Sequence, residues 1–186
     1  MTNEMPESSP SPGEVVTGIE VRLVQEEDLP QIDMILEAWV RDPGTGVIIQ
    51  REVDEVLERI RQGIDNPENG TNVVAEDLQG RVIGVMGIYP VDPEMQQYVT
   101  TDNPREINNA YVADDVRGSG AGKSLVKKLE SIGLQRGYKE LVLNSGPRYK
   151  ETGWEFWKRV YGEPVDVAKD YYGPGYDAMV WRKLLG

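Results

Sequence analysis

The stretch that decides the fold runs from Glu106 to Leu125 and reads E-I-N-N-A-Y-V-A-D-D-V-R-G-S-G-A-G-K-S-L. Its first part, 107–113, has the pattern of a short strand, and apolar residues at a helical period begin at Leu125. A glycine-rich turn at 118–122 joins the two. Because the first turn of a helix leaves its backbone N–H groups unpaired, this strand–turn–helix unit predicts a binding site for phosphate.

One candidate for such a site is the P-loop of nucleotide-binding proteins. A P-loop requires a glycine, four further residues and then Gly-Lys-Ser/Thr. Gly122, Lys123 and Ser124 supply the end of this motif, but the position of the first glycine is held by Arg117. No acid at a strand end is evident for Mg²⁺ either, so the spacing disfavours a P-loop.

The other candidate is the pattern Arg117-x-x-Gly120-x-Gly122. With this pattern the chain resembles the GNAT superfamily of acyl-CoA-dependent N-acetyltransferases. The flanking residues also fall at the family spacing, with an acid that opens the strand, a Tyr-Val pair near its end, an acidic step and a Val-Arg-Gly sequence. These are Glu106, Tyr111-Val112, Asp114-Asp115 and Val116-Arg117-Gly118.

The rest of the chain gives the element order β-α-α-β-β-β-α-β-α-β, the order of that family, over about residues 19–185. The pattern predicts strands at 19–23, 71–76, 81–89, 107–113, 141–143 and 178–184, and helices at about 26–40, 52–64, 125–137 and 148–161. A further short strand is expected near 165–167. Periodicity alone predicts a mixed α/β domain. The resemblance implies a GNAT-like α/β (α+β) domain with a central, mixed, mostly antiparallel sheet of 6–7 strands flanked by about four helices. We assign this domain to 19–186 and a flexible, Pro/Ser/Glu-rich tail to 1–18.

The composition excludes several kinds of site. The 186 residues contain neither cysteine nor histidine. Disulfide bonds, zinc sites of the usual His/Cys type, and Ser-His-Asp or Cys-His catalysis are therefore impossible. Any general base must be a carboxylate, an amine of perturbed pKa, or a water molecule that such a group activates. We predict no metal cofactor.

The net charge of −12 bears on the partners. It repels nucleic acid and anionic membranes and favours a cationic substrate, although solubility alone is the plainer interpretation. No apolar run approaches the ~20 residues that span a bilayer, and the first residues lack the pattern of a signal peptide. We expect a cytoplasmic monomer or homodimer that binds neither nucleic acid nor membrane.

The resemblance implies the reaction and the cofactor site. An acetyl group would pass directly from acetyl-CoA to a primary amine on a small molecule or a protein. Backbone groups near the strand end would lie beside the pantetheine arm, the glycine-rich turn would hold the pyrophosphate, and an amide after the fifth strand could contact pantetheine. The implied cofactor-binding residues are Tyr111, Val112, Arg117, Gly118, Gly120, Ala121, Gly122, Lys123, Ser124 and Asn144.

The catalytic groups are less closely matched to the family. Glu106 stands where the family often places a general base that acts through water, although an ordinary solvated acid fits the sequence as well. The tyrosine that commonly serves as general acid is replaced by Trp157, whose indole cannot supply a proton. Tyr161, one helical turn further on, is the expected substitute, Tyr149 is a second one, and core packing is the alternative role for both. The tryptophan also raises the alternative of an acyl-CoA-binding sensor or interaction domain without turnover.

Overall fold

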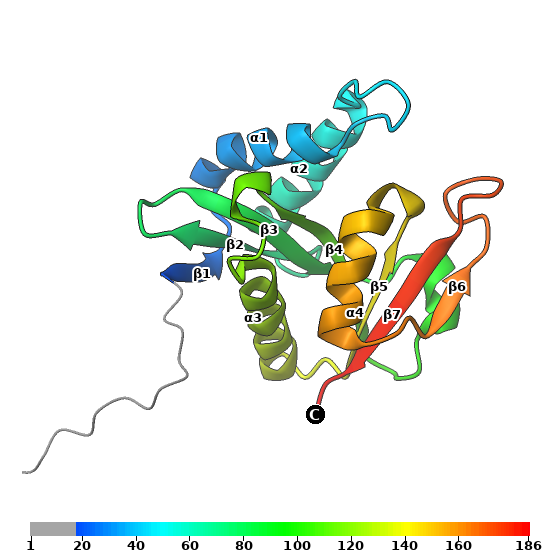
Figure 1. Cartoon of the computed structure of the whole chain (residues 1–186). Helices are drawn as coiled ribbons and strands as arrows, with labels where there is room; N and C mark the ends of the chain where they lie inside the picture. The colour runs from blue at the N-terminus through cyan, green and yellow to red at the C-terminus, as the bar shows by residue number, and fades with distance from the viewer. Residues whose placement is uncertain (1–17) are drawn as a thin grey trace, which may run out of the picture.

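The computed structural model describes residues 18–186, and its centre is a seven-stranded sheet in the order β1-β2-β3-β4-β5-β7-β6 (Figure 1). The predicted tail lies outside the described residues, except for Gly18. Only β4 and β5 are parallel, so the predicted mixed, mostly antiparallel sheet is confirmed. The strands are β1 (Ile19–Leu23), β2 (Thr71–Asp77), β3 (Val82–Tyr89), β4 (Pro104–Val112), β5 (Glu140–Ser145), β6 (Asp166–Ala168) and β7 (Ala178–Leu184).

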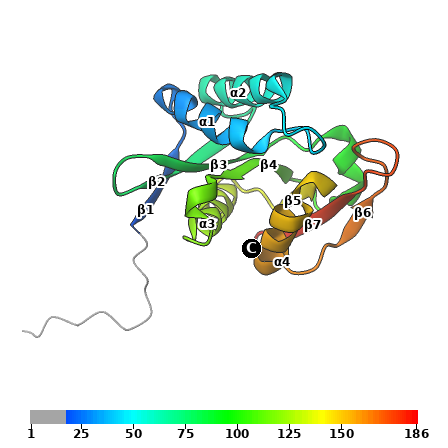
Figure 2. The same ribbon diagram turned by 45° about the horizontal axis from the view of Figure 1, so that its top comes forward.

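Helices cover both faces of the sheet (Figures 1 and 2). They are α1 (Leu29–Trp39), α2 (Gln50–Asp65), α3 (Ala121–Gln135) and α4 (Glu155–Tyr161). Neighbouring residues of β2 show the division, because Val74 packs with α1 and α2 whereas Val73 and Ala75 pack with α3. This strand is apolar on both faces because both faces are covered.

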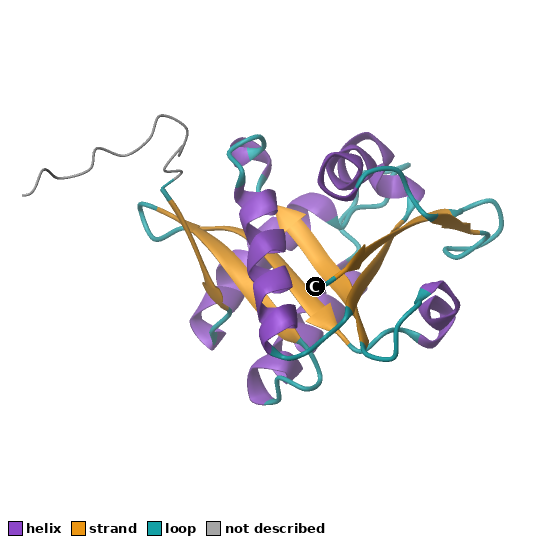
Figure 3. Cartoon of the chain, turned by 90° about the horizontal axis from the view of Figure 1, so that it is seen from below, coloured by secondary structure: helices purple, strands orange, loops and turns teal. Residues whose placement is uncertain are grey.

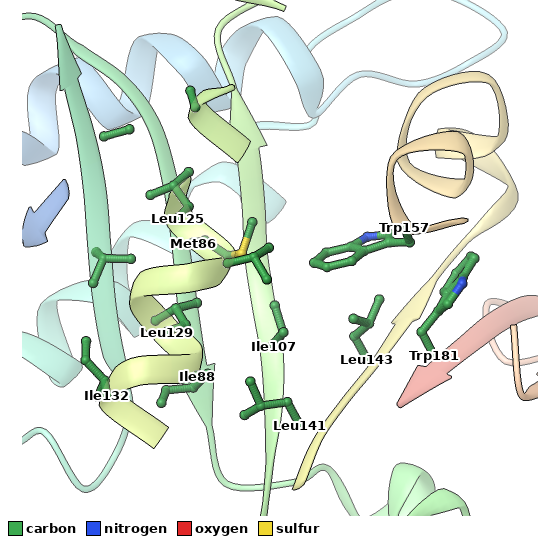
Figure 4. Close-up of a cluster of buried hydrophobic side chains, with 14 of the residues drawn as sticks. Met86, Ile88, Ile107, Leu125, Leu129, Ile132, Leu141, Leu143, Trp157 and Trp181 are labelled. Carbon is green, nitrogen blue, oxygen red and sulfur yellow. The ribbon is translucent and has the colours of Figure 1, made fainter. Parts of the chain in front are cut away.

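The core between the sheet, α3 and α4 holds the largest buried side chains (Figure 4). The helical period that starts at Leu125 continues through Leu129 and Ile132, and all three pack onto the sheet. Trp157 of α4 and Trp181 of β7 fill the space on the other side of β4 (Figure 4). The two helices thereby lie on the same face, with the N-terminus of α3 beside α4 (Figure 3).

Two predicted segments contain more structure than the sequence pattern indicated. The expected loop between β3 and β4 includes a 3-10 helix, Pro93–Tyr98, which buries Met95. The expected helix 148–161 begins with a 3-10 turn and a π-helical turn, Lys150–Trp154, before α4. π-Helical turns are rare and are frequent at functional sites.

Among residues 18–186, no helix combines the length and the apolar character that crossing a bilayer requires. In the same residues no three His, Cys, Asp or Glu side chains gather as a metal site would need.

Candidate active site

A cavity of about 600 Å³ lies where β4 and β5 separate. The two strands are paired over three positions only, from Pro104–Glu140 to Glu106–Val142, and then diverge (Figure 4). The cavity is lined by the later residues of both strands, by the N-terminus of α3, and by α4 with the turns before it. Past the last paired position, the strand edges that face the cavity are not occupied by sheet hydrogen bonds between β4 and β5. An extended molecule can therefore lie between them.

The glycine-rich turn forms one end of this cavity. Gly118 and Gly120 have φ of 82° and 95°, a left-handed conformation that glycine adopts without strain. Within residues 18–186, no hydrogen bond is made by the backbone N–H of Gly118, Gly120, Gly122 or Lys123. These N–H groups, together with the dipole of the 15-residue α3, make a site suited to a phosphate group.

Trp39, at the end of α1, fixes the position of this turn. Its indole Nε1 donates a hydrogen bond to the carbonyl oxygen of Val112 at 2.8 Å. The guanidinium of Arg117 lies over its ring, 4.4 Å from the ring centroid, and is paired with Asp114 at 2.6 Å. The side chain of Arg117 is thus a brace between the turn and α1.

A bulge in β4 shapes the wall beside the cavity. The pairing of β3 with β4 shifts register between Val85 and Gly87, and Asn109 opposite has φ of 57°. The buried amide of Asn109 donates to the hydroxyl of Tyr89 at 2.7 Å, and that hydroxyl donates to Asn72 at 2.6 Å. Side-chain hydrogen bonds therefore hold this left-handed conformation in place.

Glu106 is buried in the last paired position of β4, and only 2% of it is exposed. Its carboxylate accepts hydrogen bonds from the backbone N–H of Asp92, at 2.8 Å, and from the side-chain amide of Asn144, at 3.3 Å. Burial raises the pKa of this carboxyl above its ordinary value. Glu106 does not line the cavity, so Asn144 is its link to the cavity wall.

Tyr172, in the connection between β6 and β7, continues that link. Its hydroxyl donates to Oδ1 of Asn144 at 2.5 Å. Its ring packs over Gly146, where an added Cβ would lie 2.8 Å from the ring. A hydrogen-bonded chain from Glu106 through Asn144 thus ends at a hydroxyl that lines the cavity.

The other tyrosines divide into those at the cavity and those away from it. Tyr149 lines the cavity and packs edge-on against Tyr111. Tyr161 does not line it, and its buried hydroxyl faces Glu130 of α3 without a hydrogen-bond partner. Burial raises the pKa of Tyr161. Trp157 is buried against Tyr161 and also lines the cavity.

The structure thus brings most of the sequence-predicted site residues together. Ser124 is the one cofactor candidate that does not line the cavity, and the two catalytic candidates, Glu106 and Tyr161, lie behind its wall. The others line it: Tyr111, Val112, Arg117, Gly118, Gly120, Ala121, Gly122, Lys123 and Asn144. The sequence reasoning did not identify Trp39 or Tyr172. Both come from segments distant in sequence, and a tryptophan at a helix end or a tyrosine in a Gly/Pro-rich connection carries no specific signal.

The chain is similar to known acetyltransferases. The model of the acetyltransferase (GNAT) family matches residues 32–173. The uncharacterized N-acetyltransferase CT2212 of Chlorobaculum tepidum is 28% identical over 165 residues, which cover 87% of this chain and 83% of that protein. A GNAT-family structure from Desulfovibrio desulfuricans superposes with a TM-score of 0.72 at 19% identity, over 90% of this chain and 99% of the other. An aminoglycoside 6′-N-acetyltransferase complexed with coenzyme A superposes with a TM-score of 0.65 at 18% identity, over 90% and 97%.

Proposed function

Because the chain belongs to the GNAT acetyltransferase family and is an acyltransferase, we propose that it moves an acetyl group directly from acetyl-CoA to a primary amine. The observation that carries this proposal is the continuity of the cavity. A phosphate site made by the unpaired N–H groups of Gly118, Gly120, Gly122 and Lys123 opens into the space between β4 and β5. One end suits the pyrophosphate of acetyl-CoA, and the open strand edges suit the amides of its pantetheine arm.

In this proposal the backbone of Gly118, Gly120, Ala121 and Gly122 holds the pyrophosphate, with the backbone N–H of Lys123 beside it. Tyr111, Val112 and Asn144 lie along the pantetheine arm. Ser124 and the side chain of Arg117 support the turn, since Arg117 is occupied by Asp114 and Trp39. The thioester then reaches the part of the cavity near Tyr149 and Tyr172.

The chemistry requires a neutral amine, a held thioester and a proton for the leaving sulfur. The amine nitrogen attacks the thioester carbonyl carbon, the C–S bond breaks, and the sulfur leaves as the thiol of coenzyme A after gaining a proton. We assign the general base to Glu106, whose raised pKa suits that role and which would act through water. We assign the general acid to Tyr149 in place of Tyr161, since of these two tyrosines Tyr149 lines the cavity and Tyr161 does not.

Tyr172 would bind the acceptor. The carboxylate of Glu106 can only accept, so the Asn144 amide must turn its NH₂ group toward Glu106 and its oxygen toward Tyr172. The hydroxyl of Tyr172 therefore donates its hydrogen bond to Asn144, and its lone pairs face the cavity. Such a group accepts a hydrogen bond from an attacking amine.

The proposed class of acceptor follows from the net charge of the protein. With a net charge of −12, the protein attracts cationic molecules, so we propose a primary amine carried by a cationic acceptor. Solved structures of the same fold include an aminoglycoside 6′-acetyltransferase, a ribosomal-protein-alanine N-acetyltransferase from Brucella melitensis and the spermidine/spermine N-acetyltransferase SpeG from Vibrio cholerae. We expect the reaction to need no metal and to take place in the cytoplasm, on a monomer or homodimer.

A second candidate is an acyl-CoA-binding sensor without turnover. It is favoured by Trp157, which is 4% exposed and stands in place of the expected tyrosine. Coenzyme A release, measured with a broad panel of amines, separates the two candidates. Turnover with at least one amine supports the enzyme, whereas acetyl-CoA binding without any turnover supports the sensor. A calorimetric titration that shows no binding of acetyl-CoA would overturn both.

A further inference from the structure

The outer end of the cavity has no role in holding the acetyl group or the pantetheine arm. If the pantetheine arm lies between β4 and β5 and the pyrophosphate lies at 118–122, the nucleotide must continue past the start of α3. It then enters the rim between α3 and α4, which lie on the same face of the sheet (Figures 1 and 3). The two helices are close here, since an added Cβ on Gly122 would lie 2.9 Å from the ring of Phe156.

Three basic side chains line the cavity: Arg117, Lys123 and Arg159. The guanidinium of Arg117 is already paired with Asp114 at 2.6 Å and stacked on Trp39. Lys123 and Arg159 are exposed, and in the part of the chain that the structure describes neither has an ion-pair partner. Two cations on the cavity rim are therefore available to a ligand.

Coenzyme A carries its negative charge in two places, the pyrophosphate and the 3′-phosphate of the ribose. The unpaired N–H groups of the turn can serve the pyrophosphate. The 3′-phosphate, which is close to a dianion at pH 7, is attached to the ribose beyond the pyrophosphate, and the cavity lining also includes the acids Glu151 and Glu155. In a protein of net charge −12, this group requires a local positive charge. Arg159 is four residues after Glu155 on α4 and therefore on the same face.

We propose that Lys123 and Arg159 bind the 3′-phosphate of coenzyme A and make the protein discriminate coenzyme A from dephospho-coenzyme A. This inference rests on the proposed function, because it takes coenzyme A as the ligand. Lys123 reaches the phosphate from the first turn of α3, and Arg159 reaches it from α4 across the rim. The guanidinium suits this role, since its fork of N–H groups matches two phosphate oxygens.

Calorimetric titration of coenzyme A and of dephospho-coenzyme A into the full-length protein tests the proposal without knowledge of the amine acceptor. For the wild type we expect coenzyme A to bind roughly tenfold more tightly, as two partly exposed charge pairs would give. Arg159→Gln and Lys123→Gln should each reduce this ratio to roughly threefold, and the double variant should abolish it. Raising the salt concentration should also reduce it.

Lys158→Gln is the matched control. It removes the same charge from the same helix, but Lys158 points away from the cavity toward Glu163, at 3.9 Å. This variant should keep the full wild-type ratio. Equal affinity of the wild type for both ligands, or an Arg159→Gln variant that discriminates as well as Lys158→Gln, would overturn this inference and leave the proposed function standing. Absence of binding of either ligand would overturn both.

Discussion

The hydroxyl of Tyr172 and the side-chain amide of Asn144 are joined by a hydrogen bond of 2.5 Å between two elements that are 28 residues apart. Asn144 lines the cavity and also donates to the buried carboxylate of Glu106, so this bond connects the segment between β6 and β7 to that carboxylate. The hydroxyl is fixed in direction, because the carboxylate sets the orientation of the amide.

Tyr172→Phe removes this acceptor while keeping the ring that packs on Gly146. We expect the KM for the amine to rise roughly tenfold, about the effect of one lost hydrogen bond to a polar ligand, while the KM for acetyl-CoA stays within about twofold. Tyr176→Phe is the control, because Tyr176 lies on the same connection, exposed and outside the cavity lining. Equal amine KM values for the two variants would contradict the assignment.

Tyr149→Phe tests the proton donor. Loss of a general acid lowers kcat, and we expect a decrease of about a hundredfold. Tyr161→Phe should leave kcat close to the wild-type value, since its hydroxyl lies outside the cavity. Because that hydroxyl is buried without a partner, its removal should not lower the melting temperature. A larger kcat effect for Tyr161→Phe than for Tyr149→Phe would restore Tyr161 as the acid.

Titration of Glu106 should give the pH profile of kcat/KM an acidic limb. The group acts as a base only when deprotonated, and burial holds its pKa above the ordinary 4.5. As the pH falls through this raised pKa, kcat/KM should fall in proportion to the carboxylate fraction. The charged groups near it are Asp92, which adds to the increase, and Arg59, which opposes it. Glu106→Gln should lower kcat and abolish this limb in a pH profile, and a limb that persists unchanged would assign it to another group.

Gly118→Ala and Gly137→Ala form a matched pair. Both glycines have positive φ, 82° and 73°, and at both an added Cβ would meet no atom within 4 Å. Each substitution should therefore cost about 1 kcal/mol of stability from the left-handed backbone alone. Only the Gly118 variant should also bind acetyl-CoA several-fold more weakly, because Gly137 lies beyond the other end of α3. Thermal melts and titrations separate these effects.

Trp39→Phe removes the indole N–H that holds the carbonyl of Val112. We expect a loss of about 1 kcal/mol in stability and weaker binding of acetyl-CoA, since the ring also supports Arg117. Trp154→Phe loses a similar bond, from Nε1 to the carbonyl of Ser145 at 2.9 Å, and the side chain of Trp154 does not itself line the cavity. This variant should lower stability by a similar amount but should not weaken the binding of acetyl-CoA to the same extent.

The sequence predicted the parts of the site that local pattern determines. Gly118, Gly120 and Gly122 specify a turn before a helix whatever surrounds them, so the turn could be located from spacing. The same spacing placed Tyr161 beside Trp157 on α4, which is correct, but which side of that pair faces the cavity depends on how α4 packs against α3. The burial of Glu106 depends on the connection that covers it, where Asp92 donates to its carboxylate. Long-range packing of this kind has no signature in a single sequence.

The sheet order places β7 between β5 and β6, although β6 is made before β7. During synthesis, β6 therefore has no sheet partner until residues 178–184 have left the ribosome and paired with β5. The connection that carries Tyr172 joins β6 to β7. The part of the cavity wall that we propose to bind the amine is therefore assembled last. A nascent chain can form the glycine-rich turn and the whole of α3 early, but the proposed amine site would be completed only when the final strand inserts.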